Sequence, residues 1–398
     1  MTTPDHIVYM DHAGTSPLDP EVLASMEPYL TQIFGNPSSI HSVGQKTKRA
    51  LDSARDRIAR LIGCRVSEIV FTSGGTESDN AAINGVLQAL QHTGSHIITT
   101  RVEHHAVLRT CEYLESNGCQ ITYLPVDRYG RISPEQVLNA VTETTILVSV
   151  ILANNEIGTI QPVSEIASAV KQRASEMNRS IIVHTDAVQA PGLLDLQVDR
   201  LGVDLLSLSA HKFYGPKGVG LLYVRRGTEW VPQQLGGGQE RERRAGTENV
   251  AGIVGMAKAL ELAEANRPVI VTHCTELRDR MINALVERIP GTHLNGHPTN
   301  RLVNNVNMSF EKIEGEPILL GLDMAGICVS SGSACSSGSL EPSHVLLALG
   351  QDEDLARGSL RLTFGKSNTL AEVDYVVDNI ESLIHQLRKM SHFGVSGS

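Results

Sequence analysis

Short apolar runs alternate with amphipathic segments along the chain up to Val224. The runs are too short for helices and have the length of buried strands. Seven strands are predicted in this way, at residues 68–72, 96–100, 120–126, 145–152, 180–183, 205–206 and 219–224. The segments between them carry apolar residues at helical spacing, and the clearest has Ser42 as its N-cap and ends at Gly63. Strands separated by helices predict an α/β fold with a mostly parallel sheet and right-handed crossovers.

The spacing changes after Val224. A charged, glycine-bearing loop at residues 236–249 leads into a helical stretch over residues 250–288, which we expect Pro268 to break. Further apolar segments predict strands of a smaller α+β domain, at residues 301–310, 326–330 and 359–364. The length of 398 residues also favours two domains over one.

Polar residues follow the predicted strands of the larger domain. In open parallel sheets, ligands bind outside the carboxyl ends of the strands. The polar residues at those ends are Thr76, His104, Asn155, Asp186, Gln189, Ser209, His211 and Lys212. Each one alone is more often a cap or turn residue, but their gathering at successive strand ends predicts a ligand site there.

Lys212 lies in a turn just past a strand end, beside His211 and before Gly215, Pro216 and Gly218. Removal of a lysine from water disfavours its charged form, which suits Schiff-base chemistry. The alternative is a solvated surface lysine, as most lysines are.

A glycine-bearing turn, residues 73–78, joins the first predicted strand to a helix that runs to about Gln91. Such a turn offers backbone N–H groups and a helix dipole to a phosphate, and Thr76 adds a hydroxyl. The alternative is a capped helix without a ligand, since the turn is shorter than a full phosphate-binding loop.

Asp186 stands at the end of a buried strand, where an unpaired carboxylate would be costly. A carboxylate, Lys212, a flat ring at His104 and a phosphate cradle together fit pyridoxal phosphate. This cofactor requires a lysine for its Schiff base and an acidic partner for its pyridine nitrogen. A plain ion pair between Asp186 and Lys212 is the alternative.

Composition excludes several classes of protein. The net charge of −10 and the aromatic content of 4% argue against a nucleic-acid surface. No signal peptide is expected from the first ten residues, and no run approaches the roughly 18 apolar residues of a membrane span. The cysteines form no Cys-X-X-Cys pair, which predicts a cytoplasmic protein; they are Cys64, Cys111, Cys119, Cys274, Cys328 and Cys335.

Four ordered motifs resemble those of the cysteine desulfurases of the NifS/IscS type, fold-type-I pyridoxal-phosphate enzymes of the class-V aminotransferase family. They are Asp186-Ala-Val-Gln189, Ser209-Ala-His211-Lys212, Asn154-Asn155-Glu-Ile-Gly and Arg244-Ala-Gly-Thr-Glu-Asn-Val250. The resemblance runs from about Tyr9 to Tyr375. It implies a large cofactor-binding domain at residues 16–262, with a seven-stranded sheet. Residues 1–15 and 263–398 would form the smaller domain.

The resemblance also implies residue roles around the cofactor ring. Lys212 would form the Schiff base, Asp186 would pair with the pyridine nitrogen, and His104 would stack on the ring. The implied catalytic residues are Lys212, His104 and Cys335. Asn155 and Gln189 would contact the O3′ side of the ring.

The phosphate and the substrate have implied partners of their own. The phosphate would be held by Gly75, Thr76, Ser209 and His211, with Thr247 supplied by the partner subunit. Arg361, aided by Asn155, would grip the substrate carboxylate, and a bidentate grip of this kind suits arginine better than lysine. One departure from the commoner pattern is Asp11-His-Ala-Gly-Thr-Ser16, where Asp-Asn-Ala-Ala-Thr-Thr is more frequent.

Cys335 lies in a serine- and glycine-rich segment, about residues 328–342, that resembles the family's mobile loop with its nucleophilic cysteine. A glycine-rich loop permits a thiolate to travel to the substrate sulfur and then to an acceptor. The alternative is a linker with an incidental cysteine. No metal is expected, except that Cys335 could serve as a transient ligand of an iron–sulfur cluster.

The implied protein is a homodimeric cysteine desulfurase that converts L-cysteine to L-alanine. It would pass the sulfur, as a persulfide on Cys335, to an acceptor protein in iron–sulfur cluster assembly or tRNA thiolation. No direct contact with nucleic acid or membrane is expected. The alternatives are a selenocysteine lyase, another class-V aminotransferase-like enzyme, and a catalytically silent partner subunit.

Overall fold

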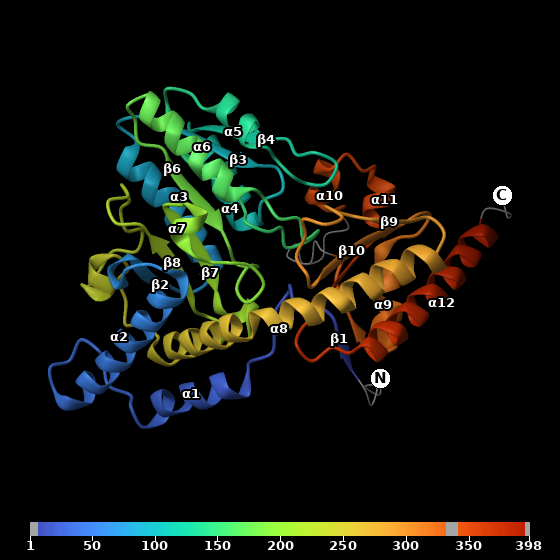
Figure 1. The fold of residues 1–398 in the computed structure, drawn as a ribbon, viewed down its shortest axis with the longest axis horizontal. Coiled ribbons are helices and arrows are strands. Elements are labelled where there is room, and N and C mark those ends of the chain that lie inside the picture. Colours follow the sequence, from blue (N-terminus) through green and yellow to red (C-terminus); the bar gives the residue numbers. More distant parts are fainter. Residues whose placement is uncertain (1–6, 332–340, 395–398) are drawn as a thin grey trace.

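The computed structural model describes residues 7–331 and 341–394, and its largest element is a seven-stranded sheet (Figure 1). The strands are β2(Ile69–Thr72), β3(His96–Thr100), β4(Gln120–Leu124), β5(Thr145–Ser149), β6(Ile182–Asp186), β7(Leu205–Ser209) and β8(Gly220–Val224). Their order is β2-β8-β7-β6-β5-β3-β4. β8 runs in the opposite direction to the other six strands, so the prediction of a mostly parallel sheet is confirmed.

The seven strands were all predicted, although several ends differ. β6 continues through Asp186, beyond the predicted end at residue 183, and β7 continues to Ser209. The extension of β6 consists of buried polar residues and that of β7 is Ser207, Leu208 and Ser209, so neither continues an apolar run. Asp186 therefore closes the strand itself and does not lie in the following loop.

Helices cover both faces of this sheet because successive strand residues point to opposite sides. Ile98, Val148 and Val183 pack on one face, in the core that includes apolar side chains of α2(Ser42–Ile62), α6(Val163–Glu176) and α8(Val250–Arg288). Their neighbours along the strands pack on the other face, against α3(Gly75–Leu90) and α4(His105–Ser116). The remaining helices of this part are α1(Pro20–Thr31), α5(Pro134–Ala140) and α7(Val198–Leu201).

Helix ends follow local signals closely. The capping box at Ser133 and Gln136 is present before α5, and Gly63 ends α2 with a φ of 73°. The predicted N-cap of α2 is wrong by one residue, since His41 accepts the hydrogen bond from Gly44 N and Ser42 is the first helical residue.

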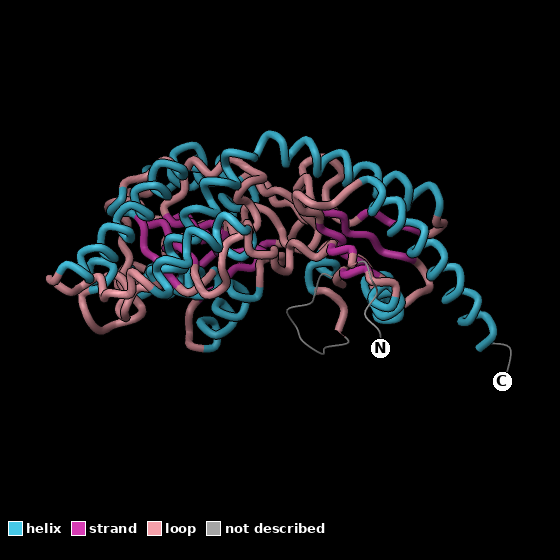
Figure 2. Tube along the Cα trace, turned by 90° about the horizontal axis from the view of Figure 1, so that it is seen from below, coloured by secondary structure: helices cyan, strands magenta, loops and turns pink. Residues whose placement is uncertain are grey.

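Pro268 does not break α8, so this prediction is wrong. The helix runs through it without interruption and extends from the part with the large sheet into the part with the smaller one (Figures 1 and 2). Residues 251–260 of α8 belong to the core of the large sheet, whereas Cys274, Leu277 and Leu285 belong to a second core. Packing at both ends holds the helix together, while Pro268 itself is exposed.

The second core surrounds a three-stranded antiparallel sheet of β9(Thr292–Leu294), β10(Asn305–Phe310) and β12(Ser359–Thr363). The N-terminal strand β1(Val8–Tyr9) joins this part by pairing with β11(Ile327–Cys328). The helices here are α9(Gly315–Met324), α10(His344–Ala348), α11(Glu353–Arg357) and α12(Leu370–Gly394). The strands at 301–310 and 326–330 are shorter than predicted, and the domain boundaries at residues 15 and 262 stay a prediction.

A buried ion pair anchors the loop that precedes α8. Arg55 Nη1 of α2 donates to Glu240 Oε2 (2.8 Å), Arg55 Nη2 bonds Oε1, and the N–H of Phe71 donates to Oε2 (2.9 Å). Both side chains are at least 95% buried. Glu240 thus ties the charged loop to strand β2.

We expect Glu240→Gln to lower the free energy of unfolding by about 3 kcal/mol, because it leaves a buried guanidinium without its counter-charge. Urea unfolding followed by circular dichroism measures this loss. The control is Glu242→Gln, an exposed glutamate in the same loop, which should change stability by about 0.5 kcal/mol or less. Equal effects of the two substitutions would contradict the prediction.

Candidate active site

A cavity of about 870 Å³ opens at the carboxyl ends of β3, β5, β6 and β7. All the strand-end residues singled out in the sequence line it, together with Gly75 and Arg361. The structure therefore brings together Gly75, Thr76, His104, Asn155, Asp186, Gln189, Ser209, His211, Lys212 and Arg361. Thr247 does not line this cavity and is exposed on the loop anchored by Glu240.

Lys212 is held by the backbone of the N-terminal segment. It ends the 3₁₀-helix η2(Ala210–Lys212), which follows β7 directly. Its Nζ donates to the carbonyl oxygens of Ala13 (2.6 Å) and Gly14 (2.7 Å). Gln189 Nε2 donates to the same Ala13 oxygen (3.1 Å). Neutral acceptors thus position the amine within the cavity.

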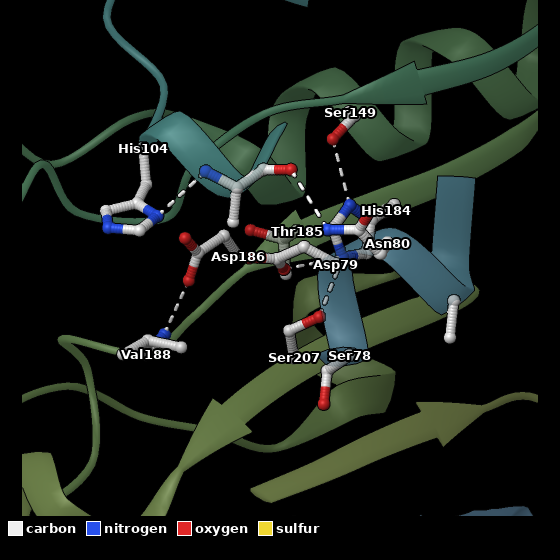
Figure 3. Close-up of polar contacts among 12 residues, drawn as sticks. Ser78, Asp79, Asn80, His104, Ser149, His184, Thr185, Asp186, Val188 and Ser207 are labelled. Atoms are coloured by element: carbon white, nitrogen blue, oxygen red, sulfur yellow. Dashed lines mark hydrogen bonds and ion pairs between the residues drawn. The ribbon is translucent and has the colours of Figure 1, made fainter. Parts of the chain in front are cut away.

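Asp186 and His104 lie in the same wall (Figure 3). Asp186 Oδ1 accepts from Val188 N (2.9 Å), and burial raises the pKa of Asp186 to about 6, opposed by this N–H group and by Lys212. His104 Nδ1 accepts from Ala106 N (3.1 Å), so the neutral ring carries its proton on Nε2. Burial and the charge of Lys212 lower the pKa of His104 to about 4.

The start of α3 forms a tight backbone cradle. A Cβ atom on Gly75 would lie 2.8 Å from Val188 Cγ2, so only glycine fits without a shift of its neighbour. Ser209 is next to it, at 3.5 Å from the same position. Thr76 is exposed on the following position, and His211 Nδ1 is 3.1 Å from Thr15 Oγ1. These groups surround the N-terminus of a helix of 16 residues, which favours an anion.

Arg361 of β12 reaches the cavity from the other core. Its Nη1 donates to Asn155 O (3.0 Å), and its Nη2 pairs with Asp11 Oδ1 (2.8 Å). The side chain is only 4% exposed, and its Nε makes no hydrogen bond to any residue that the structure describes. The guanidinium is thus oriented while part of its donor set is left for a ligand.

Cys335 lies outside the described residues, but both ends of its segment are placed. Before it, Ser330 exchanges two backbone hydrogen bonds with Arg361, Ser330 N to Arg361 O (3.2 Å) and Arg361 N to Ser330 O (2.6 Å). After it, Ser343 Oγ donates to Glu156 Oε2 (2.5 Å), one residue from Asn155. The segment thus leaves and returns beside residues of the cavity wall.

Several acidic residues at the site were missed in the sequence. Asp79, Glu103 and Glu156 are buried, and Asp11 pairs with Arg361. In the sequence they resemble the ordinary acidic residues of helix starts and turns. Spacing from the strand ends could have indicated Glu103, which precedes His104, but nothing local distinguishes Asp79 from any other acid near the start of a helix.

The comparisons with known proteins agree with this arrangement. A family model described as aminotransferase class-V matches residues 8–376. The chain is 52% identical to "Cysteine desulfurase IscS" of Methanosarcina thermophila, covering 98% of this chain and 95% of that one. It is 53% identical to the protein of the same name in Dictyoglomus turgidum, at 97% and 96% coverage.

A solved structure titled "NIFS-LIKE PROTEIN" superposes with a TM-score of 0.90 at 39% identity, covering 96% of this chain and 100% of that one. The chain therefore belongs to the class-V aminotransferase family of pyridoxal-phosphate-dependent enzymes. Within that family it groups with the cysteine desulfurases of the NifS/IscS type, as its motifs indicated.

Glu103 should give the unfolding free energy a distinct pH dependence. Burial raises its pKa from 4.5 to about 8, although Thr100 Oγ1 and Ile151 N donate to Oε1. The folded state then binds more protons than the unfolded state between these values, so stability falls as pH rises, by at most about 1.4 kcal/mol per pH unit.

We expect Glu103→Gln to remove this component, because glutamine keeps the accepting oxygen and cannot ionise. The gain in stability of the variant over the wild type should grow from pH 5 to pH 8, as measured by urea unfolding at each pH. Glu103→Ala, which also loses the hydrogen bonds, is the comparison. Wild-type and Glu103→Gln profiles that run parallel would overturn the prediction.

Proposed function

We propose that this protein is a cysteine desulfurase that binds pyridoxal phosphate and carries sulfur from L-cysteine on Cys335. The observation that supports it most strongly is the convergence of Lys212, Asp186 and Arg361 on one cavity. An amino acid that reacts on this cofactor needs an amine for the Schiff base, a carboxylate for the pyridine nitrogen and a cation for its own carboxylate. The family relationship agrees with this reading.

The cavity residues fit pyridoxal phosphate. The Gly75 cradle at the start of α3, with Thr76, Ser209 and His211, suits the phosphate. Asp186 suits the pyridine nitrogen because its buried carboxylate gains from a positive partner. The groups that would hold the ring and form the Schiff base are His104, Asn155, Gln189 and Lys212. When bound, the cofactor supplies an electron sink for the electrons released at the substrate α-carbon.

The protein's own residues would then perform distinct tasks. Arg361 would bind the carboxylate of L-cysteine, using donors that Asp11 and Asn155 leave unused. The amine of Lys212, once released, would move the proton of the α-carbon as a general base and acid. His104, neutral above pH 4, would lie against the ring without adding a charge.

Sulfur transfer would be a nucleophilic step by Cys335. Its thiolate attacks the substrate sulfur, so that an S–S bond forms and the substrate C–S bond breaks. The electron pair of that bond stays with the substrate carbon, which gains a proton and leaves as L-alanine. The sulfur remains on Cys335 as a persulfide for an acceptor protein. The anchors of its segment, beside Arg361 and Glu156, support access of Cys335 to the cavity.

The remaining parts of the proposal concern partners and location. A homodimer would let Thr247 of one subunit approach the phosphate of the other, consistent with its exposure on an anchored loop. The sulfur acceptor would be a protein of iron–sulfur cluster assembly or tRNA thiolation. Cytoplasmic location agrees with the free thiols of all five described cysteines. No helix among the described residues has both the length and the apolar character needed to cross a membrane.

Cys335→Ser tests the proposed function. With pyridoxal phosphate and L-cysteine, we expect the variant to form L-alanine at least about a hundredfold more slowly, because it lacks the nucleophile, while the visible absorbance of the bound cofactor persists. The control is Cys119→Ser, which changes a half-buried cysteine between α4 and β4. Alanine formation at the wild-type rate would refute the role of Cys335, and a preference for selenocysteine would favour a selenocysteine lyase.

Arg361→Lys tests the substrate site separately. Lysine keeps the charge but not the planar set of donors, so we expect the KM for L-cysteine to rise about tenfold or more, with the cofactor absorbance unchanged. Arg280→Lys, an exposed arginine of α8 paired with Asp374, should leave the KM unchanged. An unchanged KM in Arg361→Lys would show that the carboxylate binds elsewhere.

A further inference from the structure

A buried polar cluster adjoins Asp186 in the cavity wall, and its other members, among them Asp79, have no role in the function proposed above. Asp79 reaches from α3 toward His184 and Asp186 of β6 (Figure 3). Asp79 is 1% exposed and His184 is fully buried. Ser149 of β5 and Ser207 of β7 complete the cluster.

Two carboxyl groups in this cluster are too close to be ionised together. One oxygen of Asp79, one of Asp186 and a ring nitrogen of His104 lie within 4.8 Å of one another. Like charges at this separation in a buried site force one group to keep its proton. Asp186 is the better place for the charge, because Val188 N donates to it and Lys212 stabilises it electrostatically. Asp79 Oδ1, in contrast, has no hydrogen-bond partner in the described structure.

The hydrogen-bonding groups around Asp79 form a chain that a protonated carboxyl completes. His184 Nε2 is 3.0 Å from Ser207 Oγ, and His184 Nδ1 is 2.9 Å from Ser149 Oγ. The Ser207 hydroxyl also interacts with Asp79 and lowers its pKa, but burial and the charge of Asp186 raise that pKa by more. Burial lowers the pKa of His184 to about 3, so its ring is neutral and offers one donor and one acceptor. When Asp79 is protonated, Ser207 no longer needs to donate to it and can donate to His184, which donates to Ser149.

Few other titratable groups bear on Asp79. Glu103 and His104 precede α4, and Glu103 raises the pKa of Asp79 further, after burial and Asp186. His184 and Asp186 belong to β6. The other strands packed against α3 contribute the hydroxyls of Ser149 and Ser207 and the apolar side chains of Leu222 and Val224. No cation among these groups would favour an ionised Asp79.

We propose that Asp79 is a positioning residue that keeps a proton, so that the negative charge of the two buried carboxyl groups is confined to Asp186. Asp79 acts through Asp186. Its consequence for catalysis rests on the proposed function, since a fixed charge on Asp186 is what a protonated pyridine nitrogen requires. The placement of the proton does not depend on that function.

Infrared spectroscopy of the full-length wild-type protein without cofactor tests the proton directly. In protein labelled with carboxyl-¹³C aspartate, the carbonyl band of any protonated aspartic acid shifts. The carbonyl band of protonated Glu103 stays in place. At pH 8, where Asp186 is ionised, we expect one shifted acid band, from Asp79. The absence of an isotope-sensitive acid band at pH 8 would overturn the proposal, even if the protein failed to bind pyridoxal phosphate.

Asp79→Asn provides a second test. Asparagine imitates the protonated acid, so the acid band should vanish at pH 8, while the proton affinity of Asp186 changes by about threefold or less. A fall of tenfold or more in that affinity would mean that Asp79 is ionised in the wild type, and would overturn the proposal. With cofactor and L-cysteine, kcat of Asp79→Asn should stay within about threefold of the wild type, whereas Asp79→Ala, which breaks the chain, should lose at least about tenfold.

Discussion

The structure depends on a short N-terminal segment, Asp11 to Thr15, that lies between the two functional cations. Its backbone carbonyls at Ala13 and Gly14 hold Lys212, and Asp11 holds Arg361. Lys212 ends the 3₁₀-helix that follows β7 of the large sheet, and Arg361 belongs to β12 of the smaller one. One segment therefore fixes the position of both cations, although they are far apart in sequence and packed in separate cores. Neutral carbonyls hold the amine by hydrogen bonds, and the carboxylate of Asp186 interacts with it electrostatically.

Much of this arrangement was predictable because parallel strands deliver their polar ends to one edge. The strand-end residues from Thr76 to Lys212 were identified from apolar runs alone, and they all line one cavity. Their assignment to ring, phosphate and substrate came from motifs, since spacing cannot distinguish a phosphate cradle from a helix cap. The smaller part was less predictable, because its strands are short and its polar residues, such as Asn305 and Asn307, are buried by tertiary contacts.

The residues that sequence reasoning missed share one property: their environment is created by distant segments. Asp79 follows Glu77 and Ser78 near the start of α3, just beyond the first turn, where an acid is not unusual in the sequence. Only the folded sheet places His184 and Asp186 beside it. Pro268 is the converse case, because a strong local signal for a helix break is overridden by packing on two cores. Predictions from the local sequence fail at these positions because packing against distant segments decides which conformation and which protonation state is stable.

Burial also decides which groups of the cavity carry charge. The pKa values of His104 and His211 are lowered to about 4, mainly by burial, so both rings are neutral at physiological pH. The cationic side chains that line the cavity are then Lys212, Arg361 and Arg109. If the histidines were charged, they would bind a phosphate more tightly but would also compete with Lys212 for anionic partners. With both rings neutral, the phosphate would be held by the cradle at the start of α3 and the substrate carboxylate by Arg361, so these two separate sites would set the orientation of what binds between them.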